Sequence, residues 1–199
     1  MLAHNVPDWY IWSCKKIQYM FPKAHAAAYV MMAFRIAYFK VFYPLAYYTA
    51  FFSIRASAFD YEIMCQGKER IDAYIKNIKA QIDRGENKPK DVDVLKDAKI
   101  VQEMYARGFS FMPIDIYKAH ATRFQIIDGK IMPSLGSIEG MGDKAAEAVM
   151  EAAKDGPFLS KEDFRNRTKV SKTVIDTMSD LGLFGNLTES NQMSFIDFM

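Results

Sequence analysis

The sequence has little cysteine and little net charge, and both shortages narrow the classes of protein it can encode. Cys14 and Cys65 are the only cysteines among 199 residues, and no histidine pair lies near either one. A zinc site is therefore not expected, and a reducing, cytoplasmic setting fits best. The formal charge of +2 is only mildly basic, so composition alone does not indicate a nucleic-acid-binding protein. Any DNA-binding site must be local.

The sequence also lacks a secretion signal and an uninterrupted apolar run of membrane length. Residues 1–12 carry neither a basic segment nor a small-residue cleavage site. The longest apolar stretch, residues 24–34, stops at Arg35. A transmembrane span here would place that arginine near the bilayer centre, at a cost of roughly 2.5–3.5 kcal/mol. We expect neither secretion nor membrane insertion.

Half of the residues are hydrophobic, which is enough for one sizeable core or two small ones. The apolar spacing predicts a mainly α-helical chain, interrupted by one β-hairpin where two short apolar runs flank Asp128-Gly129. No internal repeat is apparent. The predicted helices cover residues 6–20, 22–43, 61–84, 92–107, 144–153 and 170–181. Residues 45–55 form a further apolar segment, and residues 161–167 a short turn-and-helix piece. These elements suggest a multi-helix domain at 1–108, a smaller domain at 109–187 and a tail at 188–199.

The predicted helix at 22–43 is apolar on every side, which is typical of a helix in the middle of a protein. Either this chain buries it, or neighbouring domains cover it. Pro22 suits a first helical position, and Lys23 and His25 follow it. Cations oppose the dipole at that end unless an anion such as a nucleoside triphosphate lies there. The alternative is a solvated lysine beside a partly buried histidine.

Residues 138–149 hold a second candidate site, in which two glycines one residue apart lead into an alanine-rich helix. Glycine permits positive φ and leaves backbone N–H groups uncovered, so a phosphate can contact the turn and the helix N-terminus together. The segment resembles the helix-hairpin-helix motif, which binds the DNA backbone without reading sequence. In that resemblance Gly140, Met141 and Gly142 form the turn, Ile138 is the buried residue before it, and Lys144 faces a phosphate. Ala145 and Val149 would pack inside.

Two other interpretations of this turn remain open: a turn that only packs against protein, and a different glycine-rich phosphate loop. No Gly-Lys-Ser/Thr follows, and a third glycine is missing, so neither a Walker A loop nor a dinucleotide fingerprint fits. We do not expect ATP hydrolysis here.

Three segments, residues 19–29, residues 35–44 and residues 163–172, together resemble the C-terminal end of the PolC-type DNA polymerase III alpha subunit. The resemblance covers essentially the whole chain. It implies that residues 1–108 end a fingers domain, that 109–187 bind duplex DNA, and that Lys23 and His25 lie toward the incoming nucleotide. Family chemistry is nucleotidyl transfer assisted by two metal ions, for which Mg²⁺ is expected in the full-length polymerase. This chain has no acidic pair matching the palm aspartates, so it is expected to bind no metal and to be inactive alone.

The resemblance extends to the C-terminal tail. Family members end in a Gln-Leu-Ser-Leu-Phe peptide that docks on the sliding clamp, and the aligned residues here are Gln192, Met193, Ser194, Phe195 and Ile196. Phe195 and Ile196 replace the Leu-Phe pair, and three further residues follow. A disordered end is the alternative.

The resulting hypothesis is a C-terminal fragment of a bacterial, cytoplasmic, nucleoid-associated DNA polymerase. Its expected partners are duplex DNA, a deoxynucleoside triphosphate, the sliding clamp and the remainder of the polymerase chain. Two alternatives are a stand-alone helix-hairpin-helix module of repair or recombination and a purely structural helical interaction domain.

Overall fold

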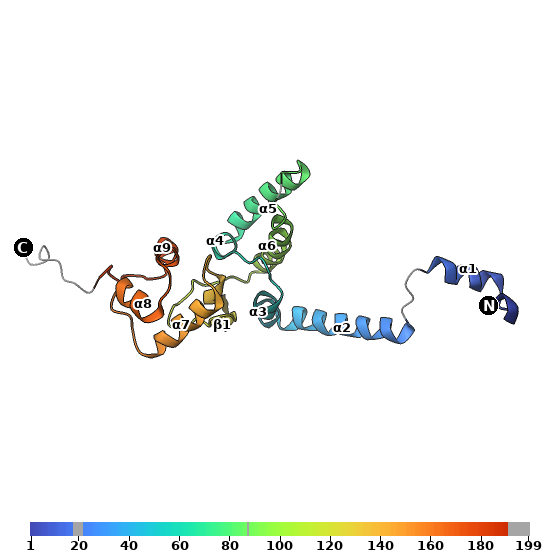
Figure 1. Ribbon diagram of the computed structural model, residues 1–199, viewed down its shortest axis with the longest axis horizontal. Coiled ribbons are helices and arrows are strands. Elements are labelled where there is room, and N and C mark those ends of the chain that lie inside the picture. Colours follow the sequence, from blue (N-terminus) through green and yellow to red (C-terminus); the bar gives the residue numbers. More distant parts are fainter. Residues whose placement is uncertain (18–21, 87, 191–199) are drawn as a thin grey trace, which may run out of the picture. The chain divides into compact units, whose positions relative to one another are not determined.

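The computed structural model describes residues 1–17, 22–86 and 88–190 and is mainly α-helical, with one two-stranded antiparallel sheet. The chain divides into two compact units, Met1–Phe42 and Tyr43–Met199. Figure 1 labels the elements. Their bounds are η1 Leu2–His4, α1 Asp8–Lys16, α2 Lys23–Phe42, α3 Pro44–Ile54, α4 Tyr61–Met64, α5 Lys68–Asp83, α6 Asp91–Ala106, β1 Gln125–Ile127, β2 Lys130–Met132, η2 Leu135–Ser137, α7 Asp143–Lys154, α8 Lys161–Thr168 and α9 Lys172–Asp180.

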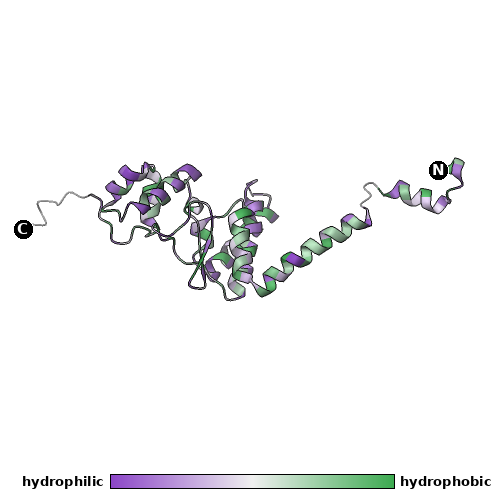
Figure 2. Ribbon diagram, turned by 90° about the horizontal axis from the view of Figure 1, so that it is seen from below, coloured by the Kyte–Doolittle hydropathy of each residue, from purple (hydrophilic) through white to green (hydrophobic). Residues whose placement is uncertain are grey.

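The first unit contains α2, whose 20 residues include none that is buried. Phe34 is 72% exposed, and most of the α2 ribbon is green or pale in Figure 2. Within the unit Met1–Phe42, α2 is therefore not buried, and cover by neighbouring domains stays a prediction. The helix begins at Lys23, one residue later than predicted, because the Pro22 carbonyl accepts the N–H groups of His25 and Ala26 in the manner of an N-cap.

In the described ranges no single helix has the length and hydropathy needed to cross a membrane. Only α2 and α3 taken together, across the break at Tyr43, meet that criterion.

The second unit has a first core formed by α3, α5 and α6. Ile71, Ile75 and Ile78 follow helical spacing along α5 and are all buried, and α5 packs along α6. Asp97 of α6 is 5% exposed and accepts the Ala58 N–H at 2.9 Å. Burial raises the pKa of this carboxyl group.

The predicted continuous helix at 61–84 is wrong, because the chain breaks between α4 and α5. Gly67 takes φ +98° there, a conformation that L side chains rarely adopt. The Tyr105 hydroxyl fills the break, donating to the Met64 carbonyl at 2.9 Å and accepting the Gly67 N–H at 3.3 Å. A tyrosine from α6 thus replaces the helical hydrogen bonds that the break removes.

The β-hairpin at Asp128-Gly129 is confirmed, with register Gln125↔Met132. Both turn residues have positive φ, 49° and 74°, as the favoured two-residue turn requires. Ile131 belongs to the first core and Met132 to the second. The hairpin therefore links the two cores, and the boundary proposed at residue 108 stays a prediction.

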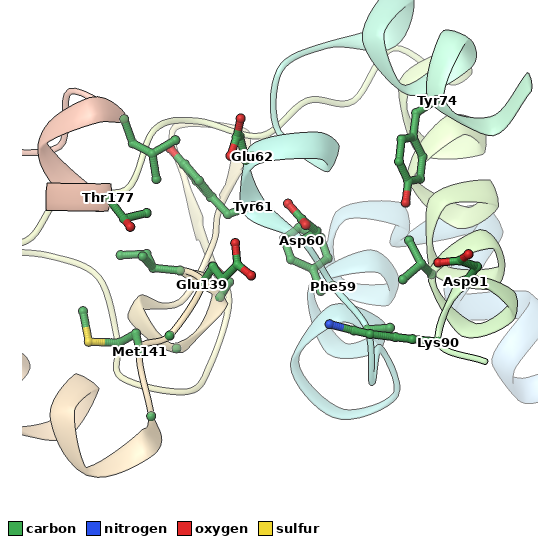
Figure 3. Close-up of a pocket in the computed structure, with 18 of the residues that line it drawn as sticks. Phe59, Asp60, Tyr61, Glu62, Tyr74, Lys90, Asp91, Glu139, Met141 and Thr177 are labelled. Carbon is green, nitrogen blue, oxygen red and sulfur yellow. The ribbon is translucent and has the colours of Figure 1, made fainter. Parts of the chain in front are cut away.

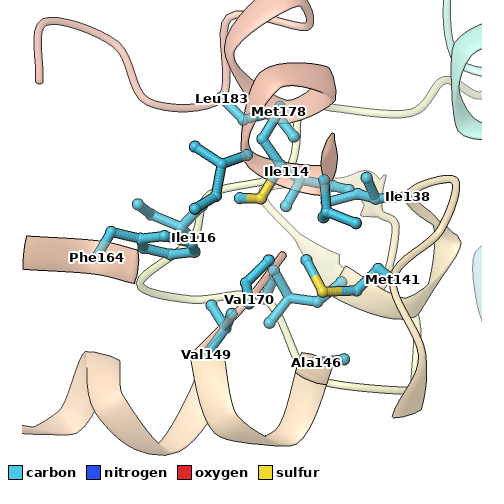
Figure 4. Packing of buried hydrophobic residues seen from close by; sticks show 14 of the residues in the cluster. Ile114, Ile116, Ile138, Met141, Ala146, Val149, Phe164, Val170, Met178 and Leu183 are labelled. Carbon is cyan, nitrogen blue, oxygen red and sulfur yellow. The ribbon is translucent and has the colours of Figure 1, made fainter. Parts of the chain in front are cut away.

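The second core brings α7, α8 and α9 together around buried side chains that include Phe164, Val149 and Met178 (Figure 4). The start of α8 is held by the chain beyond α9, because the N–H groups of Lys161 and Glu162 donate to the carbonyls of Thr188 and Glu189. The first residues of the predicted tail are therefore anchored on α8.

Candidate nucleic-acid interface

The turn between η2 and α7 has the backbone geometry of a tight hairpin. Ile138 precedes it and is 2% exposed, and its carbonyl accepts the Met141 N–H at 3.0 Å. Gly140 takes φ +77°, and Met141 turns into the second core (Figure 4). The predicted burial of Ile138 before the turn is confirmed.

The two glycines of the turn have different roles. Gly142 has φ −74° and ψ 158° and is the N-cap of α7, a conformation open to any residue. A Cβ added there would meet nothing within 4 Å. Gly140 provides the positive φ of the turn. Gly142 has no side chain, so the backbone N–H groups at the start of α7 have no side-chain cap.

The start of α7 has unused hydrogen-bond donors. In the described part of the chain, nothing accepts the backbone N–H groups of Gly142, Asp143, Lys144 or Ala145, and the first helical bond runs from Ala146 to the Gly142 carbonyl. Gly142 also contributes no side-chain cap. Unused donors at a helix N-terminus favour an anion. The exposed Lys144 lies beside them.

One flank of this turn is acidic. A cavity of about 630 Å³ lies between the turn and the α4 region, and its lining includes Asp60, Glu62, Asp91 and Glu139 (Figure 3). Carboxylates repel phosphate, so the favourable approach for a nucleic-acid backbone is from the side of the α7 N-terminus. The same lining contains Lys88 and Lys90, which offset only part of this charge.

A second turn of the same form lies between α8 and α9, and sequence reasoning missed it. Lys169 takes φ +58°, Val170 is 3% exposed, and Ser171 is an N-cap with φ −65° and ψ 151°. The first and third residues match Gly140 and Gly142 in conformation, and Val170 matches Met141 in burial, 29 residues later. The signal in the sequence is an apolar residue, Val170, directly before a serine that can cap a helix. The second turn was not recognised because it contains no glycine.

The two turns pack against each other. An ideal Cβ on Gly140 would lie 3.3 Å from Cγ2 of Val174, in the first turn of α9. Met141 and Val170, the central residues of the two turns, enter the same core (Figure 4). A pair of turns on one core presents two helix N-termini together.

The structure places the other predicted residues as follows. Val149 is buried, and Ala145 is half-buried and packs against the same core, as predicted. Ala146, which was not predicted to be inside, is fully buried. Lys23 is exposed on α2, and the His25 ring packs edge-on against Tyr29 with centroids 4.5 Å apart. Residues 192–196 lie outside the described residues. Within the described ranges no group of three or more His, Cys, Asp or Glu could hold a metal ion.

Comparison with known proteins agrees with this geometry. Residues 108–193 match the family described as helix-hairpin-helix motif, a range that contains both turns. Over 195 residues the chain is 50% identical to a DNA polymerase III PolC-type of Caldanaerobacter subterraneus subsp. tengcongensis and 49% identical to one of Clostridium perfringens. Over 197 residues it is 47% identical to the protein of that name from Streptococcus agalactiae.

These alignments cover 98–99% of this chain but only 13–14% of each relative. The chain therefore spans about one seventh of the length of the curated relatives it matches. Identity near one half along almost the whole chain leaves no doubt about common descent. The chain belongs to the PolC-type DNA polymerase III family, in which it corresponds to a C-terminal region that contains a helix-hairpin-helix domain.

Proposed function

We propose that this chain holds duplex DNA, without sequence preference, for a replicative DNA-directed DNA polymerase. The observation that carries the proposal is the set of unaccepted N–H groups at the start of α7, next to the exposed Lys144. Backbone donors and a lysine contact phosphate oxygens, which are the same in every sequence. The identity to PolC-type polymerases supports the replicative setting, and with it a bacterial cytoplasmic location at the nucleoid.

The test uses two lysines at opposite ends of α7. Lys144 lies in its first turn, whereas Lys154 ends the helix and pairs with Glu151. The affinity of each variant for a fluorescent duplex is measured over a range of salt concentrations. We expect Lys144→Ala to weaken binding and to reduce the slope of log K against log salt by about 0.9, the value for one lost phosphate contact. Lys154→Ala removes the same charge and should leave the slope unchanged. Equal slopes in both variants would remove the α7 N-terminus as the DNA site.

Polymerase activity is a property of the longer proteins, and we propose that this region contributes binding while the metal-bound catalytic centre, with Mg²⁺, lies elsewhere. Primer extension by this chain alone would contradict that division.

Nucleotide binding at Lys23 and His25 is a separate proposal. It is supported by their place in the first turn of α2, where an anion suits the helix dipole. Lys23→Ala should weaken triphosphate binding, whereas Lys40→Ala, at the far end of the same helix, should not.

Clamp attachment through residues 192–196 is a further proposal, supported by the aligned tail sequence. Competition between this chain and a clamp-binding peptide, with Gln192→Ala and Phe195→Ala as variants, decides it. Equal competition before and after the substitutions rejects the motif.

A further inference from the structure

A hollow rich in hydroxyl groups lies beside the start of α7, and the phosphate site described above does not account for it. Its volume is about 340 Å³. Aromatic side chains of the first core line part of it, and its polar lining includes Ser57, Thr122, Ser134, Ser137 and Asp143. We call this the serine hollow. All of its residues belong to the unit Tyr43–Met199.

The hydroxyl group of Ser134 is the part of the serine hollow that favours a bound ligand. The residue is 4% exposed, and its hydroxyl makes no hydrogen bond with any described residue. The hydroxyl is nevertheless not fully buried, because among the described residues only the Thr49 hydroxyl is both fully buried and without a partner. Neighbouring Ser53, in contrast, donates to the Thr49 carbonyl at 2.7 Å and accepts the Phe124 N–H at 2.9 Å. A hydroxyl group that is not used within the protein can donate to a ligand, and Ser134 is among the residues that line the hollow.

A close backbone contact assembles the serine hollow. The Gly136 N–H donates to the Ala121 carbonyl at 2.8 Å, and a Cβ on Gly136 would lie 3.1 Å from that same oxygen. A side chain at residue 136 would force the two segments apart by a few tenths of an ångström, so glycine suits this contact. Thr122, which follows Ala121, lines the hollow together with Ser137. The hollow thus depends on a glycine outside the Gly140–Gly142 turn.

The position of the hollow indicates what it binds. Asp143 is the first residue of α7 and Ser137 ends η2, so the hollow borders both sides of the Gly140–Gly142 turn. A strand whose phosphate lies on the α7 N–H groups must continue past this border. Serine and threonine hydroxyls are common donors to phosphate oxygens. The one charged group in the lining is the Asp143 carboxylate, which would oppose such a ligand.

We propose that the serine hollow binds a second phosphodiester group of the same DNA strand, with the hydroxyls of Ser134, Ser57 and Thr122 as donors. This inference rests on the proposed duplex-binding function and extends it to residues that lie before the helix-hairpin-helix turn. It makes two predictions of opposite sign. Removal of the Ser134 hydroxyl weakens duplex binding, and removal of the Asp143 charge strengthens it.

The experiment measures the affinity of the full chain for a fluorescent duplex. We expect Ser134→Ala to weaken binding about three- to tenfold, the effect of one hydrogen bond to a charged group, and Asp143→Asn to strengthen it about two- to fivefold. Thr177→Ala, in the acidic cavity on the other flank of the turn, serves as the control and should match the parent chain. If Ser134→Ala does not fold, Thr122→Val removes another hydroxyl donor of the hollow, at a residue that is exposed.

Duplexes with a single neutral methylphosphonate, placed at successive positions, identify the phosphate. At the position served by the hollow, Ser134→Ala should cause no further loss of affinity. Parent-level binding by the Ser134 and Thr122 variants overturns the inference and leaves the proposed function intact. Weaker binding by Asp143→Asn also overturns it, because the hollow then takes a cationic group. Absence of duplex binding by the parent chain is the separate result that rejects the proposed function.

Discussion

The two turns of the helix-hairpin-helix domain share one backbone path but treat their helix N-termini differently. At the first turn Gly142 leaves the N–H groups of α7 without a partner. At the second turn the Ser171 hydroxyl accepts the Val174 N–H at 3.4 Å. The first turn is therefore open to an external anion, whereas the second partly satisfies its own helix. Under the proposed function, the first turn binds DNA and the second mainly packs against the protein.

The residues with positive φ differ in the same way. A Cβ on Gly140 would lie 3.3 Å from the Val174 side chain, which would have to shift, whereas the side chain of Lys169 is exposed. The comparison predicts opposite responses to substitution at equivalent positions.

The largest expected effect is the loss of stability in Gly140→Ala. Alanine at φ +77° is strained, and its Cβ would press on Val174 at 3.3 Å. We expect the free energy of unfolding to fall by about 1–3 kcal/mol, measured by urea denaturation. Gly85→Ala is the control for backbone strain alone, because φ is +71° there and nothing lies within 4 Å of the added Cβ. An equal loss in both variants would mean that the packing of the two turns adds nothing.

The sequence predicted most of the helices, the hairpin and the first turn, because local signals carry them: apolar spacing, Asp128-Gly129 and the glycine pair. It did not predict the second turn, since Lys169 takes the left-handed conformation at the C-cap of α8, where glycine is the usual signal. It also missed the break at Gly67, which a distant tyrosine stabilises, and the serine hollow, which depends on the contact of Gly136 with Ala121. These features depend on residues that are far apart in the chain or on backbone contacts without a side-chain signal.

The next effect in size is the loss of the serine cap in Ser171→Ala. The Ser171 hydroxyl satisfies an otherwise unused N–H of α9, so its removal should lower the free energy of unfolding by about 1 kcal/mol. Duplex affinity, measured under conditions where the variant is folded, should change little. A large loss of affinity with intact folding would show that the second turn binds DNA as directly as the first.

A smaller effect is expected when the first turn is given the cap of the second. Gly142→Ser places a hydroxyl where Ser171 has one, in a conformation that serine adopts freely. Stability should rise by a few tenths of a kcal/mol, while duplex affinity falls because the new hydroxyl competes with phosphate for the α7 N–H groups. Gly142→Ala separates the two contributions, since it adds bulk without an acceptor. If Gly142→Ser improves both stability and affinity, the open N–H groups are not the binding determinant.

The smallest change in stability is expected for Lys169→Gly, the reverse of the substitution at Gly140. Relief of the positive φ stabilises the folded chain, but glycine adds conformational freedom to the unfolded chain, and the two contributions of about 1 kcal/mol nearly cancel.

The remaining effect of Lys169→Gly is electrostatic, because the substitution removes one positive charge. If Lys169 faces the same duplex as Lys144, the salt slope of binding should fall by about 0.9; if the second turn serves packing alone, the slope stays at the parent value. Lys169→Ala removes the same charge but keeps a side chain at positive φ. Lys169→Gly and Lys169→Ala should therefore differ in stability but have the same salt slope of binding. Disagreement in slope would mean that the backbone conformation of this turn, and not its lysine, governs its contribution to DNA binding.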